Sequence, residues 1–518
     1  MKTPTILLIL DGWGIYQDYN GNAITQAKTP VYDLLWKNYP HTQLVAHGKA
    51  VGLPATQDGN SESGHLNLGA GRIVEQDTVV ISKAINTGVF FKNTALKDTV
   101  EHIKKHKSNV HLIGLLSGWQ SAHSDPDHLL ALLTFYRQQS VKDVYIHLFT
   151  DGRDSFKYGA LKFLEKLEKQ MKNNEKIASI SGRYYAMDRK KKWGRIEKIY
   201  NSMVLGTAKH YSKDAKQAIQ QAYDRGETDE FIAPTVIVEN NNIPVAKIKN
   251  NDAVIFFNLR SDRARELTKA FAQKDFNRKN PGSFKRKKTL KDLLFVAMTD
   301  FGPDLDSILS AFPSEDIKQT LPMALADLRQ LYISENEKYA HVTYFFNGGY
   351  ADPVGNENRL MIPSVDVSHY DLKPEMSANE VADKIIGFLE KDKYDFVTVN
   401  FANPDMVGHT GNLAAGIQAC QVVDKNLGKL LKIIQNKKGV LILTSDHGNI
   451  EEMIDQKTGE VDTQHSNYPV PFIIADFRDN AKDYRLREGG VLGSVAPTIL
   501  DLMNREIPKE MTEKSLIN

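Results

Sequence analysis

The chain has 518 residues, which is too long for one ordinary hydrophobic core and predicts two or more domains. Its 41% hydrophobic and 25% charged residues are typical of a globular protein, and no apolar stretch reaches membrane-spanning length. The net charge of +2 argues against a protein that binds polyanions over its whole surface, and the single cysteine, Cys420, excludes an internal disulfide. We therefore expect a cytoplasmic protein with no nucleic-acid partner and no membrane partner.

The first predicted element is a buried strand. Thr5–Leu10 is a continuous apolar run, which is typical of a central strand in a parallel sheet. The run is too short for the apolar segment of a signal peptide, and it ends in Asp11. Open α/β sheets bind ligands at the carboxyl ends of their strands, so Asp11 is a candidate site residue, although an Asp before Gly is also a common turn residue.

A glycine-rich loop follows, from Gly59 to Arg72, and runs into a helix-like pattern with Leu66 and Leu68. It contains Ser61, whose hydroxyl is a weak nucleophile at neutral pH until a base or a metal ion removes its proton. Glycines allow the backbone to approach a bulky anion and to turn its N–H groups toward it. Taken alone, the stretch fits a surface turn before a helix better, so the case for Ser61 depends on the rest of the chain.

The middle of the chain predicts alternating strands and helices. Strands are expected at Val110–Leu116, Val144–Phe149, Ile177–Ser181 and Val254–Asn258, and an amphipathic helix at Leu161–Lys172. Five arginines lie in loops that follow these strands: Arg153, Arg183, Arg189, Arg260 and Arg263. The guanidinium group has a fixed fork of donors that suits carboxylate and phosphate, so the set indicates an anion pocket.

One strongly basic stretch lies near the end of this region. It runs from Arg278 to Lys291 and contains Pro281-Gly282. Apart from Phe284 it has no interleaved aromatic residues, so it predicts a solvated loop rather than a nucleic-acid patch.

Three more apolar runs in the last third of the chain predict buried strands: Phe396–Asn400, Val440–Thr444 and Pro469–Ala475. Acidic and histidine residues lie at the ends of these strands. Together with the two N-terminal candidates they form the set Asp11, Ser61, Asp405, His409, Asp446, His447 and His465. Carboxylates, imidazoles and a hydroxyl are suitable ligands for a pair of divalent ions such as Mn²⁺, Mg²⁺ or Zn²⁺. The i,i+4 spacing of Asp405 and His409 lets one helical turn point both side chains the same way.

This hypothesis predicts the domain organisation. Ser61 must lie beside residues from the last third of the chain, so residues 1–75 and 311–518 are expected to form one metal-binding domain. Residues 76–310 are then an inserted domain that carries the arginines and binds the substrate, given usual domain sizes. The predicted fold class is α/β with two domains.

The motifs together resemble one family, the 2,3-bisphosphoglycerate-independent phosphoglycerate mutases of the alkaline phosphatase superfamily. The resemblance extends over nearly the whole chain and depends on long motifs. They are Asp11-Gly12-Trp13-Gly14, the loop from Gly59 to Arg72, Asp151–Asp154, Ser181–Arg189, Arg260–Arg263, Glu337-Lys338-Tyr339-Ala340-His341, Phe401–His409 and Asp446–Asn449. Any one of these motifs alone is weak, and the full set is very specific.

The resemblance implies a three-layer α/β/α metal domain like that of alkaline phosphatase, with an inserted α/β phosphotransferase domain. It also implies a monomer that interconverts 3-phosphoglycerate and 2-phosphoglycerate in glycolysis and gluconeogenesis, with a phosphoserine intermediate on Ser61. Two Mn²⁺ ions are the usual cofactors, and Mg²⁺, Co²⁺ or Zn²⁺ are alternatives. One ion is expected on Asp405, His409 and His465, and the other on Asp11, Ser61, Asp446 and His447. The implied substrate-binding residues are His123, Arg153, Asp154, Arg183, Arg189, Arg260, Arg263 and Lys338.

The chain departs from the family pattern near His123. The family's stretch Ser-Asp-Gly-Gly-Val-His-Ser-His corresponds here to Ser117-Gly118-Trp119-Gln120-Ser121-Ala122-His123-Ser124-Asp125, with one residue inserted and the second histidine replaced. We call residues 117–125 the altered segment. Three smaller differences, Ser63 for valine, Ser445 for alanine and Ser261 for proline, are expected to be tolerated.

Two other functions remain open at this point. A metal-dependent phosphatase or a phosphopentomutase of the same superfamily would share Ser61 and the metal ligands but not the arginine-rich insert. A catalytically silent phosphate-binding or scaffold protein is the alternative from a different class, and only the altered segment favours it.

Overall fold

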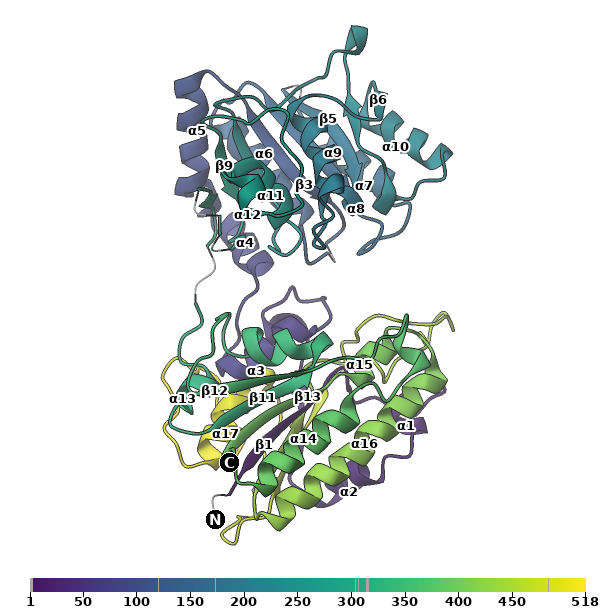
Figure 1. The fold of residues 1–518 in the computed structure, drawn as a ribbon, viewed down its shortest axis with the longest axis vertical. Helices are drawn as coiled ribbons and strands as arrows, with labels where there is room; N and C mark the ends of the chain where they lie inside the picture. Colours follow the sequence, from purple (N-terminus) through teal and green to yellow (C-terminus); the bar gives the residue numbers. More distant parts are fainter. Residues whose placement is uncertain are drawn as a thin grey trace. The chain divides into compact units, whose positions relative to one another are not determined.

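The computed structural model describes residues 3–119, 121–172, 174–302, 304–305, 307–313, 316–482 and 484–518. The chain divides into two compact units (Figure 1). Unit 1 is Met1–Gln76 with Asp316–Asn518, and unit 2 is Asp77–Glu315. Each unit contains one eight-stranded sheet among its described residues. The α/β fold class expected from the sequence is therefore confirmed.

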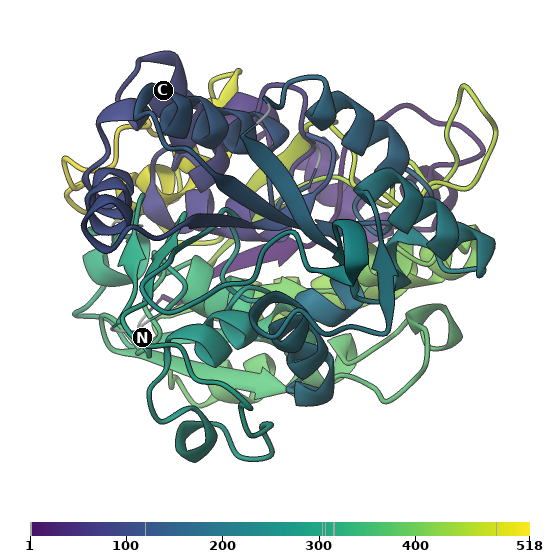
Figure 2. The ribbon, with the colours of Figure 1, turned by 90° about the horizontal axis from the view of Figure 1, so that it is seen from above.

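The sheet of unit 1 combines strands from both ends of the chain. Its order is β12-β11-β13-β1-β14-β15-β2-β16, in which β15 alone runs antiparallel to its neighbours. Figures 1 and 2 show the purple N-terminal strand among the green strands of the C-terminal segment. The strands are β1 (Thr5–Leu10), β2 (His41–Val45), β11 (Gln330–Glu335), β12 (Glu357–Ile362), β13 (Phe396–Phe401), β14 (Val440–Thr444), β15 (Val470–Asp476) and β16 (Gly490–Val491).

Helices cover both faces of this sheet. On β1, Ile6 and Leu8 belong to the core shared with α14 (Ala378–Glu390) and α16 (Leu413–Asn436), whereas Leu7 belongs to the opposite core, shared with α17 (Val495–Leu502). Alternate side chains of a strand point to opposite faces, so a run without polar positions is buried on both sides. The other helices of unit 1 are α1 (Ala23–Gln26), α2 (Pro30–Asn38), α3 (Ser61–Ala70), α13 (Leu321–Ala324) and α15 (Asn403–Gly408).

The register of the central strands brings their ends to one edge of the sheet. Leu10 pairs with Phe401, and Ile9 pairs with Thr444, in two parallel ladders. The residues that follow these strands, beginning at Asp11, Ala402 and Ser445, therefore lie at the same edge. This is the position where open α/β sheets bind their ligands.

Unit 2 is also built on a mostly parallel sheet. Its order is β10-β9-β8-β3-β4-β5-β7-β6, and only the β5–β7 pair is antiparallel. The strands are β3 (Val110–Leu116), β4 (Val144–Thr150), β5 (Glu175–Gly182), β6 (His210–Ser212), β7 (Thr235–Ile237), β8 (Ala253–Phe256), β9 (Leu294–Ala297) and β10 (Leu309–Ser310). The four strands predicted for this region are confirmed: Val110–Leu116 has the predicted ends, and the ends of the other three differ by at most two residues.

Helices also pack on both faces of this second sheet. One core contains residues of α4 (Asp77–Asn86), α5 (Thr94–His106), α6 (Pro126–Gln138), α7 (Ala160–Glu168) and α10 (Ala215–Asp224). The other contains residues of α8 (Arg183–Ala186), α9 (Trp193–Val204), α11 (Arg265–Ala272) and α12 (Phe276–Lys279). No helix in the described part of either unit is long and apolar enough to span a membrane.

Two sequence predictions for unit 2 need correction. The helix predicted to reach Lys172 ends at Glu168, because the chain turns there, with the N–H of Met171 bonded back to Leu167 O, before β5 begins. The basic stretch is not solvated throughout. Arg286 donates to the carbonyls of Ala270, Gln273 and Lys274, and its guanidinium lies 5.3 Å from the ring of Phe276.

Candidate active site

Ser61 is the first residue of helix α3. The side chain of Asn60 caps this helix and accepts a hydrogen bond from the N–H of Ser63 at 2.9 Å. Gly64, one turn further on, lies against the end of β14, where a Cβ would be only 2.5 Å from Asp446 O. A glycine is therefore required at this position for the helix to approach the strand end and bring Ser61 there.

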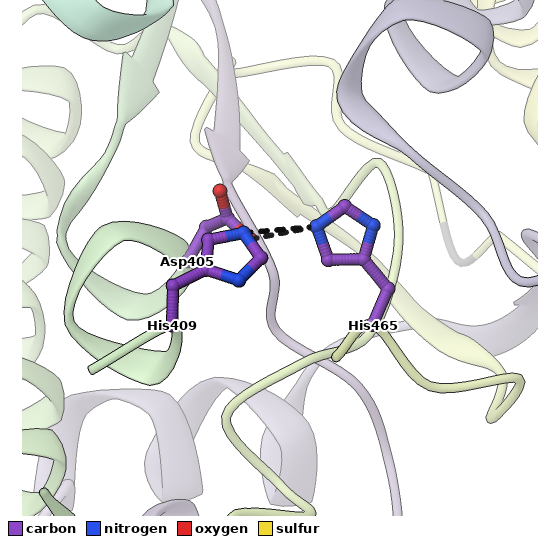
Figure 3. A group of neighbouring side chains, drawn as sticks. All are labelled: Asp405, His409 and His465. Atoms are coloured by element: carbon purple, nitrogen blue, oxygen red, sulfur yellow. Dashed lines mark hydrogen bonds and ion pairs between the residues drawn. The ribbon is translucent and has the colours of Figure 1, made fainter. Parts of the chain in front are cut away.

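The first cluster of candidate ligands is Asp405, His409 and His465 (Figure 3). Helix α15 carries Asp405, and His409 follows one turn later with its Nε2 at 3.2 Å from Asp405 Oδ1. His465 Nε2 lies 3.3 Å from the same oxygen and 3.1 Å from His409 Nε2. The expected i,i+4 geometry is present, and three ligand atoms converge on one point.

The second cluster is Asp11, Asp446 and His447, and it is completely buried. Ser61 joins it, because its Oγ lies 3.3 Å from Asp11 Oδ1 and 2.9 Å from His447 Nε2. His447 Nε2 is also 3.5 Å from Asp446 Oδ2. The structure therefore brings together the N-terminal and C-terminal residues that the sequence separates by several hundred positions.

Lys338 lies between the two clusters. It ends the short turn η5 (Asn336–Lys338) after β11, and its Nζ donates to Ser61 Oγ at 2.7 Å. The same ammonium group lies 2.7 Å from Asp11 Oδ1 and 2.5 Å from Asp405 Oδ2. Burial opposes its charge, but the two carboxylates raise the pKa of Lys338 above its ordinary value. The resemblance grouped Lys338 with the arginines, whereas the structure places it beside Ser61.

The three carboxylates of this site are under strong mutual influence. Burial and the neighbouring Asp446 raise the pKa of Asp11 to about 6. Burial has the same tendency at Asp405, but His409 and Lys338 outweigh it and hold the pKa of Asp405 well below its usual range. Concentrated negative charge of this kind requires cations for compensation.

The donor set fits divalent metal ions. Each cluster offers three carboxylate or imidazole atoms within 4.8 Å of one another, and the buried Asp446 Oδ2 faces two ring nitrogens, His65 Nδ1 at 3.1 Å and His447 Nε2 at 3.5 Å. His409 Nδ1 bonds to Thr463 O and His465 Nδ1 to Gly59 O, both at 2.8 Å, so that in the neutral rings both Nε2 atoms are free to act as metal ligands. Backbone contacts of this kind orient metal-binding histidines in proteins.

Several supporting residues of unit 1 were not assigned from the sequence. His65 Nδ1 lies 2.9 Å from Ser61 O, and its Nε2 lies 3.1 Å from Asn400 Nδ2. Asn400 donates to Asp11 Oδ2 at 2.6 Å, and Asn449 donates to Asp405 Oδ1 at 2.8 Å. His65 is one helical turn after Ser61, and this spacing was the available signal.

The arginines lie together in unit 2, at the carboxyl ends of its central strands. Arg183 is buried and pairs with Asp151 at 2.6 Å and Asp154 at 2.8 Å. Arg189 and Arg260 both face Asp262, at 3.0 Å and 3.8 Å. Two further contacts complete the group: Arg263 donates to Met187 O at 3.3 Å, and Arg153 lies 3.8 Å from Glu230.

Positive charges crowd one another in this arginine group, although four of the five arginines face a carboxylate. Burial, followed by the nearby Arg183, Arg189 and Arg153, lowers the pKa of Arg263 to about 10. Burial and then Arg260 and Arg183 lower the pKa of His123 to about 2, so His123 is neutral and lies within the same group. Crowded positive charge of this kind suits an anion, and the anion pocket expected from the five arginines stays a prediction.

Two acidic residues of this group carried no assigned role in the sequence analysis. Asp151 accepts from Arg183 and Asp262 from Arg189, so each sets the direction of a guanidinium group. The sequence contained a signal for each: Asp151 directly follows a strand, and Asp262 lies between two arginines. His123 lies among these arginines although its segment is altered, and its role in substrate binding stays a prediction. Gln120 of that segment lies outside the described residues.

Comparisons with known proteins identify the class to which this fold and site belong. Residues 3–507 match the Metalloenzyme superfamily, so the chain is a member of that superfamily. The chain is 48% identical to the 2,3-bisphosphoglycerate-independent phosphoglycerate mutase of Clostridium novyi (strain NT), over 99% of each chain. The corresponding Clostridium kluyveri protein is also 48% identical, over 100% of this chain and 99% of its own.

A solved structure agrees with these relatives. A crystal structure of Leishmania mexicana phosphoglycerate mutase at low cobalt concentration has a TM-score of 0.81 and 31% identity, covering 100% of this chain and 98% of that one. The chain therefore belongs to the family of 2,3-bisphosphoglycerate-independent phosphoglycerate mutases, and the resemblance read from its motifs is confirmed.

Proposed function

We propose that this chain interconverts 3-phosphoglycerate and 2-phosphoglycerate without 2,3-bisphosphoglycerate, through a phosphoserine on Ser61. The observation that carries the proposal is the set of charged and metal-binding groups around the hydroxyl oxygen of Ser61. Ser61 Oγ lies 2.7 Å from Lys338 Nζ, 2.9 Å from His447 Nε2 and 3.3 Å from Asp11 Oδ1. Family membership supports the same reaction.

In the first half of the reaction, Ser61 Oγ attacks phosphorus, a new O–P bond forms, and the bond to the glycerate oxygen breaks. The Ser61 hydroxyl gives up its proton along its hydrogen bond to Asp11 Oδ1, and the departing glycerate oxygen takes up one proton, so that no proton is gained or lost in this half. The Lys338 ammonium stabilises the negative charge at Oγ. The amino end of α3 favours the phosphoserine, because helix N-termini stabilise phosphate.

In the second half, the phosphoryl group returns to the other hydroxyl of glycerate, and Ser61 recovers its proton. Glycerate must turn while it stays bound, so water has to be excluded throughout. The arginine group suits this task because forked guanidinium donors bind both carboxylate and phosphate. Ser61 belongs to unit 1 and the arginines to unit 2, so the proposal requires both units to meet one substrate during turnover.

Two divalent ions belong to this proposal. Asp405, His409 and His465 would hold one, and Asp11, Ser61, Asp446 and His447 the other. Bound ions would lower the pKa of the serine hydroxyl and neutralise charge on the phosphate oxygens. We favour Mn²⁺ because it is the usual ion of the family that the motifs resemble, and the carboxylate and imidazole donors are compatible with it.

The test is an enolase-coupled assay with 3-phosphoglycerate and Mn²⁺, with and without added 2,3-bisphosphoglycerate. We expect equal rates in both conditions and far lower rates of phosphate release from an aryl phosphate or a sugar phosphate. A strict requirement for 2,3-bisphosphoglycerate would overturn the mechanism, and preferential hydrolysis of the aryl phosphate would indicate a phosphatase. We also expect a monomer, because one chain supplies every group named above, and sedimentation at assay concentration would test this. The expected location is the cytoplasm.

A further inference from the structure

The altered segment contains a hydroxyl that joins two of the substrate-binding candidates. Ser121 Oγ donates to Asp154 Oδ2 at 2.9 Å and accepts a hydrogen bond from the backbone N–H of His123 at 3.2 Å. Ser121 and His123 are both buried. The family pattern has no serine between the residues that correspond to Ser117 and His123, so this contact belongs to the segment in which the chain differs.

The Asp154 carboxylate would be poorly directed without this bond. Its Oδ2 also faces Arg183 Nη1 at 2.8 Å, and the same Nη1 donates to Asp151 Oδ1 at 2.6 Å. Asp151 already holds the neighbouring backbone, since its Oδ1 accepts from the N–H of Arg153 at 3.2 Å and of Asp154 at 3.1 Å. Asp154 Oδ2 therefore has two partners, Arg183 and Ser121. Arg183 divides its Nη1 between Asp154 and Asp151, whereas the Ser121 hydroxyl donates to Asp154 alone.

A second serine of the altered segment supports the same arrangement. Ser117 Oγ donates to Asp151 Oδ2, and both residues are buried. The two serines therefore fasten the altered segment to the two carboxylates that face Arg183.

We propose that Ser121 is a positioning residue for substrate binding, which sets the direction of the Asp154 carboxylate and the place of His123. This inference rests on the proposed function, because Asp154 and His123 act here as binders of phosphoglycerate. Ser121 itself touches no reacting atom. Its hydroxyl acts through the two residues that it joins.

The experiment compares Ser121→Ala with the full-length wild type, using 3-phosphoglycerate. A hydrogen bond to a charged group is lost, so we expect KM and the calorimetric Kd to rise roughly tenfold, with kcat changed less than KM. Ser121→Thr, which keeps the hydroxyl, should restore most of the affinity. Ser108→Ala is the matched control, because its hydroxyl bonds to Asn251 O before β3 begins, away from the arginines.

A double substitution separates positioning from general damage. If Ser121 acts through Asp154, then Ser121→Ala in an Asp154→Asn background should raise Kd by less than twofold further. Full additivity, or a Ser121→Ala enzyme whose KM and Kd stay within twofold of wild type while Asp154→Asn raises both, would overturn this inference alone. A wild-type chain that binds no phosphoglycerate would overturn it together with the proposed function.

Discussion

His409 and His465 direct the same ring atom at each other: their Nε2 atoms lie 3.1 Å apart, beside Asp405 Oδ1. Both Nδ1 atoms are engaged by backbone carbonyls. Two imidazole lone pairs facing one another repel unless a cation or a proton lies between them. The carboxylate of Asp405 supplies the attraction for either, and it raises the pKa of His409 to about 9.

Manganese and protons should therefore compete at this cluster. The metal-free His409 carries a proton below about pH 9, and a metal ligand must be neutral. Mn²⁺ affinity should rise with pH by up to ~10-fold per unit and level off near that pKa. Calorimetry in two buffers of different ionisation enthalpy measures the released proton. An affinity that is flat between pH 6 and pH 8 would contradict the assignment of His409 as a ligand.

Removal of metal should lower both activity and stability. Three buried carboxylates, Asp11, Asp405 and Asp446, repel one another, and Lys338 and protonated His409 balance them only in part. Mn²⁺ at about 100 times its Kd should stabilise the protein by about 2.7 kcal/mol. Thermal unfolding with chelator and after Mn²⁺ is added back checks this value. Full activity after exhaustive chelation, with no 2,3-bisphosphoglycerate present, would exclude the proposed mechanism.

Ser61→Ala should abolish turnover and leave substrate binding in place. Loss of a nucleophile costs at least ~10³-fold in kcat, because no other group forms the covalent intermediate. Ser63→Ala is the control: that hydroxyl bonds only to Asn60 O in the same helix turn. Mass spectrometry after rapid acid quench should detect phosphate on the wild-type peptide with Ser61 and none on the Ala variant. Phosphorylation of another residue would refute the assignment.

Arg263→Met should weaken phosphoglycerate binding without destabilising the protein. Arg263 is partly buried among Arg183, Arg189 and Arg153, so removing its charge relieves repulsion in the free enzyme. A bidentate guanidinium contact with an anion is worth enough to raise KM by roughly 10-fold or more. Arg278→Met, at an exposed arginine paired with Asp275, is the control. An unchanged KM would remove Arg263 from the binding group.

Glu335, at the end of β11, should make unit 1 less stable as pH rises. Burial raises the pKa of Glu335 to about 7 from 4.5, so its contribution is fully present below pH 4.5 and is lost as pH rises through 7. The loss is on the order of 3 kcal/mol by pH 8. Glu335→Gln should match wild type at pH 5 and be more stable at pH 8 in urea unfolding. The exposed Glu390→Gln serves as control, and equal stabilities at both pH values would refute the prediction.

The metal clusters could be predicted because strand ends are visible in the sequence. Each of Asp11, Asp405 and Asp446 follows an apolar run, and parallel strands end at one edge of a sheet. The place of Lys338 could not be predicted in this way. It depends on β11 pairing beside β13, and β13 beside β1, an order that apolar runs do not encode.

Contacts between distant loops also could not be predicted from the pattern of apolar and polar residues in the sequence. Asp262 looked like one more polar residue between two arginines, and its role appears only when Arg189 from another loop faces it. Arg286 looked like part of a solvated basic run, yet its guanidinium packs on Phe276 and bonds three carbonyls. Periodicity predicts which face of an element is buried. The contacts of long side chains such as those of arginine depend on residues that only the folded chain brings near them.

The position of β1 between β13 and β14 affects how the protein is made. The ribosome delivers Leu10 first and Phe396 much later, so the first strand must wait for both of its neighbours. At synthesis rates of about 5–20 residues per second, that wait lasts roughly 20 to 80 s, while unit 2 can already fold. During that time the apolar segment Thr5–Leu10 is without the two strands that pair with it in the folded protein.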